Sequence, residues 1–144
     1  MKVAPMVRHP LLRLAVALAV PALALSGCGG SGAGARTVEV SMVDIAFESA
    51  SLSVRAGEKV RLVFTSRGRT VHDAVVGDAE AQAAAERAGG GGGHAHGSGP
   101  PAVHLEPGES DELTYTFDET GTLVVGCHQP GHYDAGMRID VEVT

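Results

Sequence analysis

Hydrophobic and polar residues alternate along much of the chain from residue 37 onward, the pattern expected of β-strands that bury one face. In residues 37–47, Val38, Val40 and Met42 share one face. The alternation changes phase near residues 43–44, which predicts a β-bulge that keeps the segment in one strand. This segment is therefore the first predicted strand.

The same alternation recurs in segments that are separated by turns rich in Gly, Pro and Asp. Residues 51–66 predict two strands joined by the turn RAGEK, and residues 70–77 predict a strand that contains a histidine. Alternation resumes in residues 102–117 around the turn EPGES, and continues in residues 122–127 and 137–143. About seven strands without a convincing core helix indicate an all-β protein, an antiparallel β-sandwich.

Residues 78–101 interrupt this β pattern. Residues 78–88 (DAEAQAAAERA) are rich in Ala and Glu and predict about two to three turns of exposed helix. Residues 89–101 (GGGGGHAHGSGPP) are of low complexity and are predicted to be mobile. We interpret residues 78–101 as an insertion in the sandwich.

The first residues resemble an export signal. Lys2, Arg8 and Arg13 precede the apolar residues 14–25, which are too few for a typical membrane span. The sequence LSGC then ends at Cys28 and resembles a bacterial lipobox, whose cysteine is lipidated. The alternative is an ordinary secretory signal with an incidental cysteine.

These features predict three parts of the chain: a lipoprotein signal peptide (1–27), a flexible Gly/Ser-rich tether (28–36) and one folded domain (37–144). The protein is then expected on the outer face of a bacterial cytoplasmic membrane, held there by a lipid anchor. Stable anchoring needs more than one acyl chain.

Composition narrows the classes of partner. Hydrophobic residues form 44% of the sequence but aromatic residues only 3%, so the core must consist mainly of aliphatic side chains. Loss of residues 1–27 removes three of the 11 Lys and Arg residues and none of the 17 Asp and Glu residues, which leaves a formal charge of −9. This charge disfavours nucleic acid as a partner. It is compatible with a basic protein partner, or with solubility alone.

Residues 126–137 (GCHQPGHYDAGM) contain the densest group of candidate metal ligands. Four residues separate Cys127 from His132, and four more separate His132 from Met137. With Cys28 lipidated, Cys127 has no disulfide partner within the chain. Thiolate, imidazole and thioether donors suit copper and disfavour Ca²⁺ or Mg²⁺.

A blue-copper ligand set has two histidines, a cysteine and a weak axial methionine. His72 is the best second histidine because it lies within a predicted strand. A rigid β-scaffold would keep such a site nearly unchanged during electron transfer. The structural alternatives are a buried free thiol at Cys127, a surface histidine at His132, and core side chains at His72 and Met137.

Three segments carry a resemblance to a known family. CHQPGHYDAGM resembles the copper loop of small bacterial cupredoxins of the plastocyanin/azurin superfamily, and SRGRTVHDAVVG resembles the strand with their first histidine ligand. VHLEPGESDELTYTF matches their order of elements. The resemblance implies a Greek-key β-sandwich, cupredoxin-like, of about seven to eight strands. It implies one type 1 copper per chain on His72, Cys127, His132 and Met137.

One position departs from the family pattern, and several histidines are not part of the predicted ligand set. Ser66 stands where these proteins often carry an Asn that joins the two ligand loops, and the chain has no Asn. His94 and His96 form a possible secondary metal site or a solvated linker. His128 is interpreted as a loop or supporting residue, with a bridge to a second copper as the alternative. A Cys127–His132 nucleophile and base is disfavoured, because no substrate pocket is predicted.

The first functional hypothesis is a non-enzymatic, monomeric, membrane-tethered carrier of single electrons between redox partner proteins. The alternative is an envelope protein for copper tolerance or copper delivery, which the acidic chain and His94 and His96 favour. A subunit of a nitrite-reductase-like copper enzyme, acting through His128, is the least favoured hypothesis.

Overall fold

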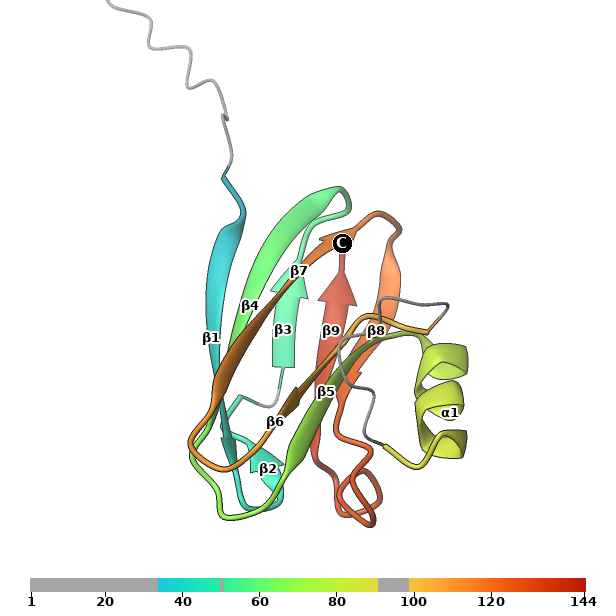
Figure 1. Ribbon diagram of the computed structural model, residues 1–144. Coiled ribbons are helices and arrows are strands. Elements are labelled where there is room, and N and C mark those ends of the chain that lie inside the picture. Colours follow the sequence, from blue (N-terminus) through green and yellow to red (C-terminus); the bar gives the residue numbers. More distant parts are fainter. Residues whose placement is uncertain (1–33, 50, 91–98) are drawn as a thin grey trace, which may run out of the picture. The chain divides into compact units, whose positions relative to one another are not determined.

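Two β-sheets packed face to face form the fold of the protein in a computed structural model (Figure 1), which describes residues 34–49, 51–90 and 99–144. The first sheet contains, in spatial order, β2 (Ala46–Phe47), β1 (Arg36–Val43), β4 (Glu58–Ser66) and β7 (Ser110–Phe117). The second contains β3 (Ser51–Val54), β9 (Arg138–Val143), β8 (Gly121–Gly126), β5 (His72–Gly77) and β6 (Ala102–Leu105). The predicted all-β sandwich is therefore confirmed.

Two strand pairs are parallel, so the predicted antiparallel arrangement is wrong for these two pairs and holds for the others. β1 pairs in parallel with β4, and β3 pairs in parallel with β9. The reason is that the chain leaves the first sheet after β2, adds β3 to the second sheet, and returns as β4 beside β1. Parallel neighbours need such a crossover, which a hairpin cannot provide.

The core lies between the sheets and follows the sequence alternation. In β4, Val60, Leu62 and Phe64 are buried, while Arg61 and Val63 between them are only partly buried. β9 repeats the pattern with alternate buried and exposed residues. Burial of these aliphatic and aromatic side chains provides the main stabilisation of the sandwich.

The phase change near residues 43–44 is a turn and not a bulge. β1 ends at Val43, and β2 folds back on it with Met42 opposite Phe47. Asp44 has a φ of 23°, in the positive range that Asp tolerates better than most residues. A Cβ on Gly68 would lie 2.6 Å from the backbone nitrogen of Asp44, so the close approach of these two loops requires glycine.

The predicted helix is confirmed as α1 (Ala79–Arg87), and Asp78 caps its first turn by accepting a hydrogen bond from the Ala81 amide at 2.9 Å. It is not fully exposed, since Gln82 and Ala85 are buried. α1 lies beside β5 and β8 (Figure 1). Among the described residues, no helix has the length and apolar character that a membrane crossing needs.

We expect Phe64→Ala to lower the free energy of unfolding by about 3–5 kcal/mol, because it removes a large side chain from a fully buried position. Urea unfolding followed by circular dichroism measures this change. Ile45→Ala is the control, because Ile45 is 52% exposed and its truncation should change the free energy by no more than about 0.5 kcal/mol. Equal losses in the two variants would contradict this assignment of the core.

Candidate metal centre

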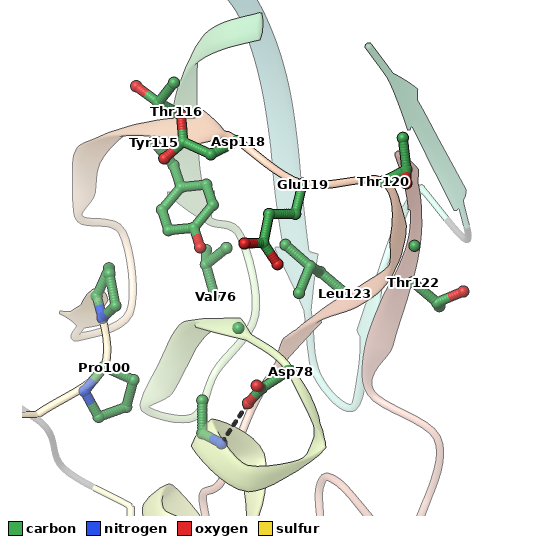
Figure 2. A pocket seen from close by; sticks show the side chains of 14 residues that line it. Val76, Asp78, Pro100, Tyr115, Thr116, Asp118, Glu119, Thr120, Thr122 and Leu123 are labelled. Carbon is green, nitrogen blue, oxygen red and sulfur yellow. Dashed lines mark hydrogen bonds between the residues drawn. The ribbon is translucent and has the colours of Figure 1, made fainter. Parts of the chain in front are cut away.

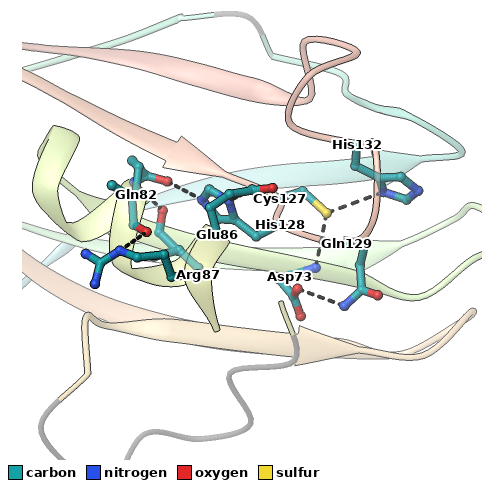
Figure 3. Close-up of polar contacts among 10 residues, drawn as sticks. Asp73, Gln82, Glu86, Arg87, Cys127, His128, Gln129 and His132 are labelled. Carbon is teal, nitrogen blue, oxygen red and sulfur yellow. Dashed lines mark hydrogen bonds and ion pairs between the residues drawn. The ribbon is translucent and has the colours of Figure 1, made fainter. Parts of the chain in front are cut away.

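The predicted ligands His72 and Cys127 meet because β5 and β8 are antiparallel neighbours. β5 begins at His72, whereas β8 ends at Gly126, one residue before Cys127. Both residues therefore lie at the same end of the sheet and are fully buried. His132 reaches them from the loop that joins β8 to β9 (Figure 3).

Three donor atoms converge at this end of the sheet. The Cys127 Sγ atom lies 3.4 Å from His132 Nδ1 and 4.0 Å from His72 Nδ1. One donor atom from each of the three residues lies within 4.8 Å of the other two. The two imidazole rings are tilted by 46°, with their centroids 5.3 Å apart. The arrangement can hold a metal ion through one sulfur and two nitrogen donors.

Backbone hydrogen bonds place Met137 beside these residues. The Met137 amide donates to the His132 carbonyl at 3.0 Å, and the Cys127 amide donates to the Met137 carbonyl at 3.1 Å. The Met137 side chain is fully buried. Gly131 and Gly136 have φ values of 81° and 95°, and glycine adopts such angles without steric cost. Hydrogen bonds within its own backbone thus hold the two ends of the loop together.

Thr70 and Asp44, which lie in two neighbouring loops, orient the ring of His72. The Thr70 hydroxyl donates to the Asp44 carbonyl at 3.3 Å, and its oxygen lies 3.5 Å from His72 Nε2. A proton on Nε2 therefore has an acceptor in Thr70. Nδ1, which faces the cluster, is then left with its lone pair available for a metal.

Asp73 connects three parts of the centre (Figure 3). Its backbone amide donates to Cys127 Sγ at 3.4 Å. Its buried carboxylate accepts a hydrogen bond from the Gln129 side chain at 2.8 Å and lies 2.7 Å from His104 Nδ1 on β6. One residue thus holds the cysteine sulfur, the ligand loop and the neighbouring strand.

Ser66 does not join the ligand loops. Its hydroxyl is buried and has no hydrogen-bond partner among the described residues. The connection that the family resemblance implies at this position is made instead by Asp73, through Gln129 of the ligand loop. The support of the site therefore differs from the family pattern, as the absence of Asn indicates.

Burial sets the protonation of the two innermost donors. It raises the pKa of the Cys127 thiol, although hydrogen bonds from the backbone amides of Asp73 and Gln129 act in the opposite direction. Burial and, to a smaller extent, the charge of His132 lower the pKa of His72. Near neutral pH the metal-free centre therefore has a protonated thiol and an uncharged His72, and a bound metal would displace the thiol proton.

His128 points away from the three donor atoms. Its side chain is only 1% exposed, and its ring nitrogens contact Gln82 and Glu86 of α1. A role as a bridge to a second copper would require both contacts to break. His128 therefore has the supporting environment that the sequence analysis favoured.

The predicted residues Cys28, His94 and His96 fall outside the described residues. His104 is not among the three converging donors and instead contacts Asp73.

A hollow of about 490 Å³ lies at the opposite end of β5 and β8 (Figure 2). It is bordered by the start of α1, Pro100 and the turn between β7 and β8. The carboxylates of Asp78, Asp118 and Glu119 line it, and none of the converging donors does. The hollow is therefore separate from the candidate metal centre.

Sequence reasoning missed Thr70, Asp73 and Gln129 as supporting residues. Asp73 and Gln129 each lie within two positions of a predicted ligand, and this proximity is the signal that could have found them. Their partners are not visible in the sequence. Asp73 contacts His104, which is 31 positions away, and Gln129, which is 56 positions away.

We expect the thiol of Cys127 in the metal-free protein to react with a thiol reagent much more slowly than in the unfolded chain. The raised pKa keeps the thiol protonated, and burial restricts access. The rate should continue to rise at pH values where an unfolded cysteine has levelled off. Stopped-flow assays in a Cys28→Ser background measure this, and equal rates with and without urea would contradict it.

Comparisons with known proteins agree with this geometry. Residues 35–144 match the family described as copper binding proteins, plastocyanin/azurin family. The chain is 37% identical over 103 residues to the copper-resistant cuproprotein CopI of Rubrivivax gelatinosus, a match that covers 71% of this chain and 62% of that protein. It is 33% identical to the protein of the same name from Pseudomonas aeruginosa, with 71% of this chain and 72% of the relative covered.

A solved structure shows the same fold. Auracyanin A, a "blue" copper protein from Chloroflexus aurantiacus, superposes with a TM-score of 0.63 at 27% identity and covers 77% of this chain and 100% of its own. The family match, which extends over most of the chain, includes the converging His72, Cys127 and His132. The chain belongs to the plastocyanin/azurin family of copper-binding proteins.

Proposed function

We propose that the protein binds one copper ion at a type 1 site and serves copper tolerance in the cell envelope. The observation that carries the proposal is the convergence of one donor atom each from His72, Cys127 and His132, all within 4.8 Å of one another. Met137 would supply the fourth donor, since its backbone is hydrogen-bonded to both Cys127 and His132 and its side chain is buried. One sulfur, two imidazoles and a thioether match the preferences of copper.

The chain prepares this site before a metal arrives. Thr70 leaves the Nδ1 lone pair of His72 facing the cluster. The backbone amides of Asp73 and Gln129 stabilise negative charge on the Cys127 sulfur, which must lose its proton when it becomes a ligand. Bound copper would supply a one-electron couple between Cu(II) and Cu(I).

The relatives support tolerance as the primary role. Both are named copper-resistant cuproproteins. The match spans 62% of the Rubrivivax protein and 72% of the Pseudomonas protein, so it omits a substantial part of each. The role is therefore proposed for the copper-binding domain of this chain. The proposal assigns no catalysis to it.

Transfer of single electrons is the second candidate. The observation that favours it is the partial exposure of His132, whereas His72 and Cys127 are fully buried. An electron could then enter or leave through this imidazole with little movement of the sandwich. The monomeric state and the redox partner proteins of this hypothesis remain predictions.

The proposed location of the protein in the cell rests on its sequence alone. We propose that the signal peptide exports the chain and that lipidated Cys28 holds it at the outer face of the cytoplasmic membrane. Copper would then be bound before it enters the cytoplasm. A secondary copper at His94 and His96 also remains a prediction.

We expect copper-loaded protein to show the intense visible colour of a thiolate-to-copper transition, and Cys127→Ser to abolish it. Met137→Leu should leave most of the colour and alter the reduction potential, because the axial ligand tunes the potential more than it holds the metal. Absorption and EPR spectra with redox titration measure these effects. A wild-type protein that stays colourless with reduced thiol and added Cu(II) would refute the site.

Deletion of the gene is expected to lower the copper concentration at which growth stops, and the wild-type gene should restore tolerance whereas Cys127→Ser should not. Growth curves in graded copper measure this, with immunoblots to show equal amounts of the two proteins. A respiratory defect without copper sensitivity would instead favour the electron-carrier role. Metal analysis that finds more than one copper per chain would support the secondary site.

A further inference from the structure

Helix α1 is fastened to the strands that carry the copper ligands. The buried Gln82 side chain donates from Nε2 to the carbonyl oxygens of Val75 on β5 and Val124 on β8, at 3.1 and 2.9 Å, with a longer contact of 3.4 Å to Gly77. A Cβ on Gly77 would lie 2.5 Å from Ala81 Cβ, so the helix approaches β5 closely. One amide thus spans the β5–β8 pair.

The same amide fixes the ring of His128. Because Gln82 Nε2 faces carbonyl acceptors, its Oε1 atom must be the group that faces His128. His128 Nε2 therefore donates to Gln82 Oε1, at 2.7 Å. The ring also stacks on Tyr133 of the ligand loop, with centroids 4.6 Å apart and planes 17° from parallel.

Glu86 holds the other side of the ring. Its Oε2 atom lies 2.7 Å from His128 Nδ1, although the Glu86 side chain is 60% exposed. A carboxylate near the last turn of a helix is unfavourable for the helix dipole. Glu86 therefore does not stabilise the helix through its charge, and its contact with His128 is the role that the structure gives it. We call Gln82, Glu86 and His128 the His128 network (Figure 3).

The His128 network is next to the proposed thiolate ligand, because His128 follows Cys127 in the chain. The two adjacent side chains point to different sides, since the Cys127 sulfur faces His132 while the His128 ring faces α1 (Figure 3). Fixing the His128 ring thus restrains the peptide that joins it to Cys127. The chain after the helix adds to this restraint, since a Cβ on Gly90 would lie 2.4 Å from the His128 carbonyl oxygen.

We propose that α1 positions the copper site, and that Gln82 and Glu86 are positioning residues that act through His128 on the Cys127 sulfur. The inference rests on the proposed role of Cys127 as a copper ligand. Residues that hold metal ligands in place typically contribute about 10–100-fold to metal affinity. The inserted helix would then be a functional part of the centre.

The test compares Glu86→Ala with two matched variants in the full chain. Glu86→Gln keeps a side chain of the same length that can hydrogen-bond with His128 Nδ1 through either its amide oxygen or its amide nitrogen. Glu80→Ala removes the same charge from the exposed first turn of the same helix. Competition with a chelator measures copper affinity, and absorption, EPR and redox titration report the geometry of the thiolate. Reaction of Cys127 with a thiol reagent, in a Cys28→Ser background, reports the metal-free protein.

Glu86→Ala should bind copper about tenfold more weakly, shift the thiolate-to-copper band and the potential, and expose Cys127 to the reagent. Glu86→Gln should restore most of the wild-type values, and Glu80→Ala should match them. Urea unfolding should show that Glu86→Ala folds, since the replaced side chain is largely exposed.

The inference would be overturned if Glu86→Ala and Glu80→Ala both kept the copper affinity, spectrum and thiol reactivity of the wild type. It would also be overturned if both variants departed from the wild type by the same amount. In either case a coloured wild-type protein would leave the proposed function standing. A colourless wild-type protein would instead remove the proposed function itself. The two failures are therefore distinguishable.

Discussion

The antiparallel pairing of β5 with β8 is the constraint on which the copper centre depends. It places the start of one strand beside the end of the other, so that His72 and Cys127 meet although 54 residues lie between them. The same pair offers the carbonyl groups that bind Gln82. The backbone hydrogen bonds between β5 and β8 thus set both the approach of His72 to Cys127 and the place where α1 packs. Side-chain contacts then adjust the positions of the individual residues.

Asp73 shows how the centre is made rigid at an energetic cost. A buried carboxylate is unfavourable unless hydrogen bonds or charges compensate it. Gln129 and His104 supply that compensation, and each comes from a different segment of the chain. The backbone amide of the same residue meets the Cys127 sulfur. Any movement of the ligand loop or of β6 therefore disturbs the hydrogen bonds of Asp73.

Much of the fold, and the grouping of candidate ligands in the loop that holds Cys127 and His132, could be predicted from the sequence, because both depend on short-range patterns. Alternation predicted most of the strands, and the spacing of Cys127, His132 and Met137 predicted a loop that could gather its side chains. The turn at Asp44 was mistaken for a bulge, since its backbone depends on a distant glycine, Gly68. The contacts of Asp73 and the buried face of α1 were missed because each needs a partner that only the folded chain brings near.

The position of Gly90 has a consequence for how this protein can change during evolution. With a φ of 71° and the His128 carbonyl against the face where a side chain would stand, Gly90 admits no other residue without strain. Gly90 is the second residue of the glycine-rich stretch, residues 89–101. Gly90 is expected to be under purifying selection like a core residue, so changes in the length of the stretch should accumulate beyond it.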